Sequence, residues 1–182
     1  MRVISGQQRG KVLVSPGHLP LRPTSNKVRA ALFNILRPQI QDATFLDLFA
    51  GTGAVGINAL SEGASEATFV EKNPTCFCAL LQNIKQMGFS DKAVVKKMSV
   101  EKFLSKHEDL YYSIVFMDPP YAFPLHHFEA ILDPLYHKTK SSCVIVVEHV
   151  KEVPLEELCT RIGFQTRLKE YSHTCLSILT KS

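Results

Sequence analysis

Residues 44–56 have the sequence TFLDLFAGTGAVG, in which a short apolar run passes through a glycine-rich turn into a helical pattern. Glycines at 51, 53 and 56 match the G-x-G-x-x-G fingerprint of nucleotide-binding folds, because they permit a tight turn and a close approach of backbone to ligand. The helix that follows directs its partly positive N-terminus at the same place. This stretch predicts a strand, a loop and a helix of a parallel α/β sheet that binds a nucleotide-like ligand.

An acidic residue at the end of the next apolar run narrows the ligand. Glu71 follows Thr68-Phe69-Val70 and lies twenty positions after Gly51, where a carboxylate can accept hydrogen bonds from both hydroxyls of a ribose. We therefore expect a cofactor that contains ribose. A nicotinamide dinucleotide and S-adenosylmethionine both fit this part of the sequence.

A second loop, Asp118-Pro119-Pro120-Tyr121, follows the apolar run Ile114-Val115-Phe116-Met117. Two prolines end a buried strand here, so the strand end presents a carboxylate, a rigid carbonyl and an aromatic ring. Together these groups can hold a planar base that carries an exocyclic amine. The carboxyl ends of parallel strands meet at one edge of a sheet, so we expect Asp118 to reach the same crevice as the glycine loop.

Two further observations favour S-adenosylmethionine. Asp47, four residues before Gly51, can face the positively charged amino acid end of that cofactor, whereas a dinucleotide site has apolar residues there. The chain has 182 residues, which is short for a dehydrogenase with a separate substrate domain. The sequence therefore predicts a methyltransferase.

Strand and helix patterns alternate from residue 44 onward, which predicts a mostly parallel sheet with helices on both faces. The expected strands are 44–49, 67–71, 93–97, 112–117 and 143–147, and the expected helices are 54–62, 74–87, 99–107, 126–136 and 154–162. Two last strands, 164–170 and 174–179, are separated by three residues, too few for a crossover, so we expect them to be antiparallel.

Charge separates residues 1–41 from the remainder. They contain seven basic residues and no acidic one, whereas residues 42–182 contain fourteen basic and seventeen acidic ones. We therefore divide the chain into a basic extension, 1–41, that contacts nucleic acid and closes the cofactor site, and a catalytic domain, 42–182. A solvated basic face without a partner is the alternative. The extension is expected to contain a hairpin of residues 2–4 and 11–14.

A helix is expected to follow this hairpin in the extension. Its start is capped by Thr24 or Ser25, and its apolar face contains Val28, Ala31, Leu32 and Ile35.

Composition indicates one compact cytoplasmic domain. No stretch has the apolar length that crosses a bilayer, and the first residues lack the apolar core of a signal peptide. Five cysteines form no C-x-x-C pair, so reduced thiols are expected and no metal site.

Three motifs in order carry a resemblance to one family: RPTSNKVR at 22–29 followed by ALFN at 31–34, the glycine loop after Asp47, and Asp118 to Tyr121. Over nearly its full length the chain resembles the RsmD family of bacterial 16S ribosomal RNA methyltransferases, which methylate the exocyclic N2 of a guanine. The resemblance implies a seven-stranded Rossmann-like sheet with an antiparallel last strand and S-adenosylmethionine as cofactor. It also implies ribosomal RNA, in a partly assembled small subunit, as substrate. We expect a monomer.

The expected site residues form three groups. The catalytic residues are Asp118 and Pro119, which accept the N–H bonds of the amine, and Tyr121, which stacks on the base. The cofactor residues are Asp47, Phe49, Gly51, Gly53, Glu71, Ser99 and Asp118. The RNA residues are Arg9, Lys11, Arg22, Lys27, Arg29 and Phe123, where packing within the loop is an equal alternative for Phe123.

Two departures from the family pattern concern the expected site. Asn26 stands where the family has an acidic residue, and Ser99 where related enzymes place Asp or Asn toward the adenine amine. Two other functions remain open. One is methylation of adenine N6 or another amine in DNA, and the other is a non-catalytic RNA-binding assembly protein on the same scaffold.

Overall fold

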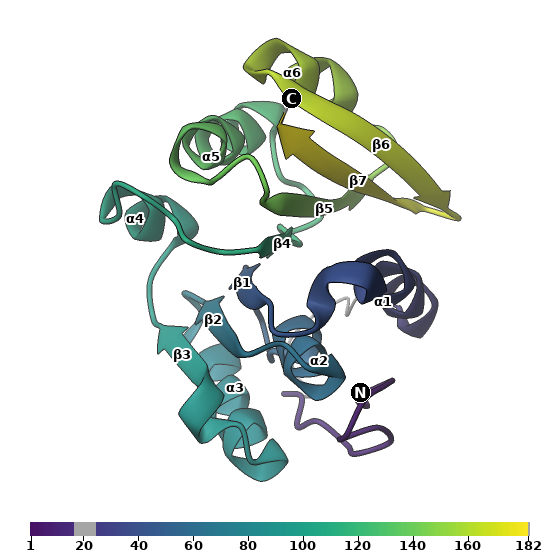
Figure 1. Ribbon diagram of the computed structural model, residues 1–182, viewed down its shortest axis with the longest axis vertical. Coiled ribbons are helices and arrows are strands. Elements are labelled where there is room, and N and C mark those ends of the chain that lie inside the picture. The colour runs from purple at the N-terminus through teal and green to yellow at the C-terminus, as the bar shows by residue number, and fades with distance from the viewer. Residues whose placement is uncertain (17–24, 182) are drawn as a thin grey trace.

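The computed structural model describes residues 1–16 and 25–181. In this part of the chain a seven-stranded sheet has the order β3-β2-β1-β4-β5-β7-β6 (Figure 1). The strands are β1 (Thr44–Leu48), β2 (Glu66–Val70), β3 (Ala93–Lys96), β4 (Ile114–Met117), β5 (Val144–Val150), β6 (Phe164–Tyr171) and β7 (Thr174–Lys181). β1 to β5 are mutually parallel, and β7 is antiparallel to both β5 and β6. The predicted α/β fold with an antiparallel end is confirmed.

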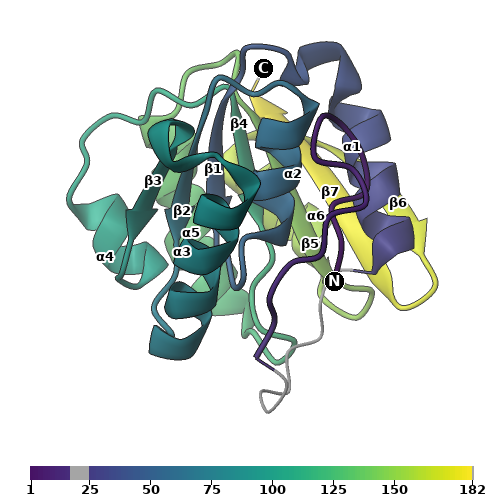
Figure 2. The ribbon, with the colours of Figure 1, turned by 90° about the horizontal axis from the view of Figure 1, so that it is seen from below.

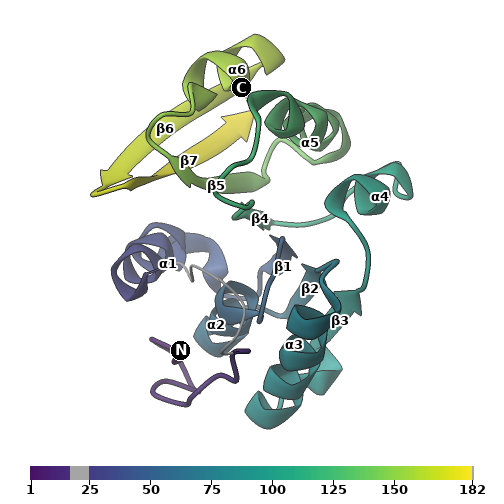
Figure 3. The same ribbon diagram turned by 180° about the vertical axis from the view of Figure 1, so that it is seen from behind.

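Helices cover both faces of this sheet (Figures 1 and 3). On one face lie α1 (Asn26–Ile40), α2 (Ala54–Glu62) and α3 (Pro74–Met87), and on the other lie α4 (Val100–Ser105), α5 (Leu125–Lys138) and α6 (Leu155–Ile162). A short 3₁₀ turn, η1 (Ser90–Lys92), precedes β3. Alternate strand residues fill the two cores: Phe116 points to the α1–α3 side and Met117 to the α4–α6 side. No helix among the described residues has the length and apolar character needed to cross a bilayer.

The glycine loop is shaped by packing as well as by its ligand. Gly53 caps α2 with φ +84°, a conformation that favours glycine. A Cβ on Gly56, in the first turn of α2, would lie 2.3 Å from Cε1 of Phe69 on β2. The absence of a side chain at position 56 therefore lets the helix sit directly on the sheet, which fixes where its N-terminus points.

The N-terminal segment folds back on itself, but its predicted hairpin is reduced to one antiparallel bridge, Arg2 with Val12. Backbone hydrogen bonds still join its two arms, among them those from Val3 to Lys11 (3.0 Å) and from Leu13 to Met1 (2.9 Å). Helix side chains hold the segment from outside: the backbone N–H of Ile4 donates to Asn58 Oδ1 (2.8 Å) and that of Val14 donates to Asn83 Oδ1 (2.7 Å). Asn83 also donates from Nδ2 to the carbonyl of Thr52 in the glycine loop (2.9 Å). Figure 2 shows this segment running along α1 and α2.

Helix α1 begins after Ser25, whose Oγ accepts from the N–H of Val28 (3.2 Å). Arg22 and Thr24 lie outside the described residues. The buried face differs from the predicted one: Ala31 and Ile35 are only half-buried, whereas Phe33, Leu36 and Ile40 are buried with Val28 and Leu32. The face is turned because the helix packs against both the sheet and the N-terminal segment.

Candidate active site

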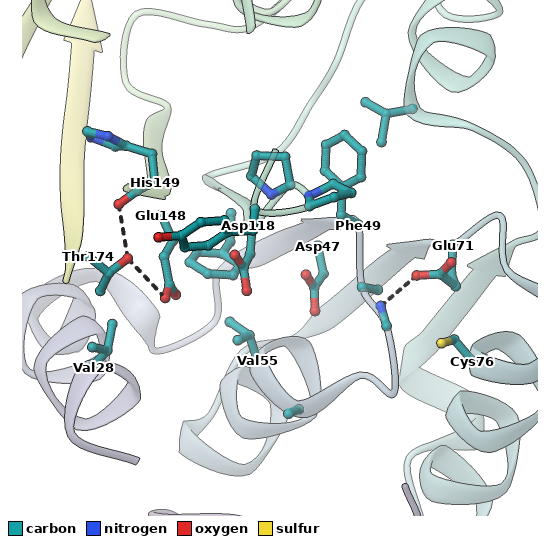
Figure 4. A pocket seen from close by; sticks show the side chains of 18 of the residues that line it. Val28, Asp47, Phe49, Val55, Glu71, Cys76, Asp118, Glu148, His149 and Thr174 are labelled. Atoms are coloured by element: carbon teal, nitrogen blue, oxygen red, sulfur yellow. Dashed lines mark hydrogen bonds between the residues drawn. The ribbon is translucent and has the colours of Figure 1, made fainter. Parts of the chain in front are cut away.

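A cavity of about 690 Å³ lies at the carboxyl ends of β1, β2, β4 and β5 (Figure 4). β1 and β4 are neighbours in the sheet, and the order of the strands reverses between them. Open α/β sheets bind ligands at such a switch point. The predicted residues that line it are Lys27, Asp47, Phe49, Gly51, Glu71, Ser99, Asp118, Pro119 and Tyr121. The structure therefore brings the glycine loop and the Asp118 loop to one site, as the sequence predicts.

Asp47, at the end of β1, is 2% exposed, and its Oδ2 accepts from the N–H of Gly56 (2.8 Å). Burial raises the pKa of this carboxyl to about 8, and the negative charges of Asp118 and Glu71 act in the same direction, against the Gly56 hydrogen bond. A positively charged ligand beside Asp47 would offset the free-energy cost of ionising this buried carboxyl. The residue is therefore placed to receive a cation, whose charge would favour the ionised form of the carboxyl.

Glu71, at the end of β2, holds the glycine loop in place. Its Oε2 accepts from the N–H of Gly51 (2.7 Å), and its Oε1 accepts from the N–H of Asn73 (2.6 Å). Each carboxylate oxygen has a second acceptor position, so these bonds leave Glu71 able to accept from ribose hydroxyls. The sequence predicts the ligand contact but gives no sign of the bond to Gly51.

The remaining cofactor residues have structural roles as well. Ser99 caps α4, and its Oγ accepts from the N–H of Lys102 (3.3 Å). Gly53 does not line the cavity, and it acts through the turn into α2. Phe49, at φ +61°, meets the ring of Phe123 edge-on, with centroids 5.4 Å apart.

Phe123 packs within its own loop. Its ring also lies edge-on to Phe128 at 5.0 Å, and it packs against the core beneath α4–α6. These contacts account for Phe123 by packing, the alternative to RNA contact.

The other side of the cavity is formed by the ends of β4 and β5. Met117 pairs with Val147, so Asp118 and Glu148 follow at the next matched position of neighbouring parallel strands. Figure 4 shows both carboxylates pointing into the cavity, beside Asp47. Pro119, which follows Asp118, is buried, whereas Tyr121 is 65% exposed at the rim.

Glu148 and His149 are buried, although they lie near the carboxyl end of β5. They are 8% and 7% exposed, because β7 pairs alongside β5 and Thr174 Oγ1 donates to the carbonyl of His149 (2.9 Å). Glu148 is the site residue that sequence reasoning missed. A Glu placed immediately after a fully apolar run, at the position that matches Asp118, is the signal that could have found it.

The predicted RNA residues do not form one surface. Lys27 is exposed on the rim of the cavity. Arg9 and Lys11 are exposed too, but the turn before Arg9 bonds to Ser61 through the N–H of Gln7 (2.9 Å). Ser61 is seven residues along α2 from Ala54 at the cavity, or about 10 Å at 1.5 Å per residue. The turn is therefore displaced from the cavity toward the amino ends of the parallel strands. Arg22 lies outside the described residues.

Arg29 requires a correction, because its side chain is completely buried. Its Nη2 donates to the carbonyl of Arg2 (3.0 Å) and to Asn26 Oδ1 (2.6 Å). Burial also lowers its pKa. The prediction that Arg29 contacts RNA is wrong: the residue ties α1 to the N-terminal segment, with the neutral Asn26 as its partner.

Among the residues that the structure describes, no group of three His, Cys, Asp or Glu side chains is arranged to hold a metal ion. All five cysteines are free thiols, and only Cys78 is exposed.

Known proteins have the same architecture and related sequences. A structure of the provisionally described methyltransferase yhhF from Escherichia coli has a TM-score of 0.84 at 32% identity, covering 100% of this chain and 98% of that one. A structure from Haemophilus influenzae, provisionally described as that of a methylase, has a TM-score of 0.78 at 29% identity, covering 99% of this chain and 97% of that one.

Curated relatives agree with these structures. The protein provisionally named rRNA methyltransferase YlbH, from Bacillus subtilis (strain 168), is 33% identical over 186 residues, covering 100% of this chain and 99% of that protein. Ribosomal RNA small subunit methyltransferase D from Escherichia coli (strain K12) is 40% identical over 121 residues, covering 66% of this chain and 60% of that protein. A family model described as Conserved hypothetical protein 95 matches residues 1–180. The chain therefore belongs to this family, the RsmD family, which includes proteins named ribosomal RNA small subunit methyltransferase D.

Proposed function

We propose that the protein transfers a methyl group from S-adenosylmethionine to the exocyclic N2 amine of a guanine in small-subunit ribosomal RNA. The observation that carries this proposal is the pair of carboxylates Asp118 and Glu148 at matched strand ends, beside a glycine loop in the same cavity. The names of the relatives supply the class of RNA, since several are called small-subunit ribosomal RNA methyltransferases.

The glycine-loop side of the cavity fits the cofactor. S-adenosylmethionine supplies an electrophilic methyl group on a sulfonium, with an amino acid end at one side and an adenosine at the other. Asp47 would face the cationic end, and ligand binding would draw its carboxyl toward the ionised form. Glu71 would accept from the ribose hydroxyls, while Ser99 lies on the lining where an adenine amine can reach it. Phe49 provides an apolar wall between them.

The Asp118 loop prepares the acceptor. An exocyclic amine on an aromatic ring is a poor nucleophile, because its lone pair is delocalised into the ring. Asp118 and the carbonyl of Pro119 accept hydrogen bonds from the two N–H groups of this amine. This arrangement favours a pyramidal nitrogen with its lone pair directed at the methyl group. The nitrogen forms the new bond to carbon as the carbon–sulfur bond breaks with its electron pair on sulfur. The nitrogen then loses one proton, for which Asp118 is in reach.

Rigid positioning of the reacting groups supplies most of the rate acceleration. The two prolines fix the carbonyl and the carboxylate before the base arrives, so little reorganisation is needed during the transfer. Tyr121, exposed at the rim, stacks on the base, which must leave its own RNA stack to enter the cavity.

Glu148 favours guanine over adenine. The Watson–Crick edge of guanine carries a ring N1–H next to its amine, whereas adenine has an acceptor nitrogen at that position. A second carboxylate beside Asp118 can accept the N1–H of guanine, but it would face the lone pair of adenine N1. The second carboxylate therefore disfavours adenine N6 in DNA as the acceptor.

A transfer assay tests the proposal. Purified protein is incubated with methyl-labelled S-adenosylmethionine and, separately, with unmodified small ribosomal subunits, naked small-subunit RNA or duplex DNA. The label is expected in RNA, as N2-methylguanosine after digestion to nucleosides. Label found only in DNA would contradict the proposal, and tight RNA binding without transfer to any substrate would favour a non-catalytic assembly protein.

A further inference from the structure

One face of the edge strand β6 carries a basic stripe that leads to the cavity. Alternate residues of a strand point to the same side, which places Gln165, Arg167, Lys169 and Tyr171 together. Arg167 and Lys169 pair with Ile178 and Leu176 of β7, whose side chains belong to the core beneath α1–α3. The stripe therefore faces the same side of the sheet as α1, and both Arg167 and Lys169 are exposed there.

Acidic side chains do not neutralise this stripe. Glu170, the acidic residue of β6, points to the opposite face, where its Oε2 accepts from Lys151 Nζ (2.8 Å). Within residues 1–16 and 25–181, neither Arg167 nor Lys169 takes part in an ion pair. The two positive charges thus stand open to solvent on one side of the sheet edge.

The stripe is continuous with the lining of the cavity. Tyr171 and the turn Ser172-His173 that follows it both line the cavity, next to Glu148 and Thr174. Arg167 lies four residues from Tyr171, or about 13 Å along an extended strand. Lys27, at the start of α1, lies on the rim of the same cavity. A polyanion that enters the cavity at one end can therefore lie along β6 at the other.

We propose that Arg167 and Lys169 bind phosphates of the RNA strand that flanks the target nucleotide. The inference rests on the proposed function, because it assumes that the base in the cavity is part of an RNA. Cations spaced along a strand and an aromatic ring at the mouth of a pocket are the combination that single-stranded nucleic acid binds. The surface differs from the predicted one, since it comes from the last hairpin of the chain and not from residues 1–41.

Salt dependence of RNA binding tests this surface. The affinity for a small-subunit RNA fragment is measured by fluorescence anisotropy at several salt concentrations, for the parent chain and for Arg167→Ala/Lys169→Ala. Two lost phosphate contacts should weaken binding several-fold and reduce the slope of log K against log salt by about 1.4, at roughly 0.7 per contact for a single strand. The variant Arg167→Lys/Lys169→Arg keeps both charges and should retain the parental slope.

The matched control is Lys85→Ala/Lys92→Ala, which removes two exposed charges near β3, at the opposite edge of the sheet. If both double variants lower the slope equally, the effect is one of net charge and the proposal is overturned. It is also overturned if Arg167→Ala/Lys169→Ala leaves RNA binding unchanged and instead promotes self-association, because the cations would then only protect a sheet edge.

Binding is measured without methyl transfer, so this outcome is independent of the transfer assay. A parent chain that binds RNA through the stripe but never methylates it would contradict the proposed function alone.

Discussion

The glycine-loop side of the cavity holds its carboxylates with backbone N–H groups, whereas the side formed by β4 and β5 presents them at two matched strand ends. Asp47 accepts from the N–H of Gly56 and Glu71 from the N–H of Gly51, so each carboxylate is held by backbone 9 or 20 residues away in sequence. Asp118 and Glu148 come from strands thirty residues apart and meet only through the register of the sheet.

This difference predicts different consequences when each side is damaged. A carboxylate bonded to the loop that it helps to shape affects stability and cofactor binding together. The carboxylates at the ends of β4 and β5 line the part of the cavity proposed to hold the acceptor base. The cofactor side should therefore respond in binding and folding, and the acceptor side in the rate of methyl transfer.

The largest expected effect is that of Asp118→Ala. Loss of the acceptor that orients the amine should reduce the single-turnover rate of methyl transfer on the order of 10²–10³-fold, comparable to the loss of one preorganised polar group in other active sites. The affinity for S-adenosylmethionine, measured by calorimetry, should stay nearly unchanged. A variant that transfers normally, or that loses the cofactor instead, would contradict the assigned role.

Asp47 should give the cofactor side a distinctive pH dependence. Its pKa is raised from 3.8 to about 8, so the folded protein binds more protons than the unfolded chain between these values. The contribution of Asp47 to the free energy of unfolding therefore falls as the pH rises through this window, by up to about 1.4 kcal/mol per pH unit. Asp47→Asn should flatten this slope in denaturant unfolding at pH 5 to 8, without cofactor present. Parallel slopes for the two proteins would show that Asp47 does not titrate in this range.

Glu148→Gln should weaken the acceptor side more mildly. The amide keeps the size of the side chain but replaces the carboxylate that would face guanine N1–H with a weaker acceptor. The expected cost is about 1–3 kcal/mol, or roughly 5-fold to 150-fold in kcat/KM for the RNA. Cofactor affinity should match that of the parent chain. Equal activity of the two proteins would remove Glu148 from guanine recognition.

Ser99→Ala should give the smallest effect, on the cofactor side. The loss of the cap of α4 costs about 1 kcal/mol of stability. Ser99→Asp restores a capping acceptor and offers a stronger one to an adenine amine. If Ser99 contacts the adenine, cofactor affinity should rise from Ala to Ser to Asp, whereas a residue that only caps the helix would give equal affinities.

The same contrast explains how much of the molecule could be predicted. The glycine loop, Asp47 and Glu71 follow from one short stretch of sequence, and each strand of the sheet follows from its own local pattern. The position of Glu148 after an apolar run is also visible in the sequence. Its burial is not, because it depends on β7 pairing beside β5 and excluding water from that strand end.

Arg29 shows a second limit. It shares a helical spacing with Phe33, Leu36 and Ile40, so its burial was available from periodicity, but its charge argued for the surface. The partners that satisfy it, Asn26 and the carbonyl of Arg2, become visible only when the N-terminal segment is in place.

Asn83 couples two parts of the chain that are far apart in sequence. Its side chain holds both the backbone of Val14 and the carbonyl of Thr52, so the glycine loop and the N-terminal segment share one anchor. The amide of Val14 should therefore exchange with deuterium at the rate at which this anchor opens. A cofactor that clamps the glycine loop will slow exchange at a residue that it never touches, which makes the beginning of the chain a reporter of occupancy.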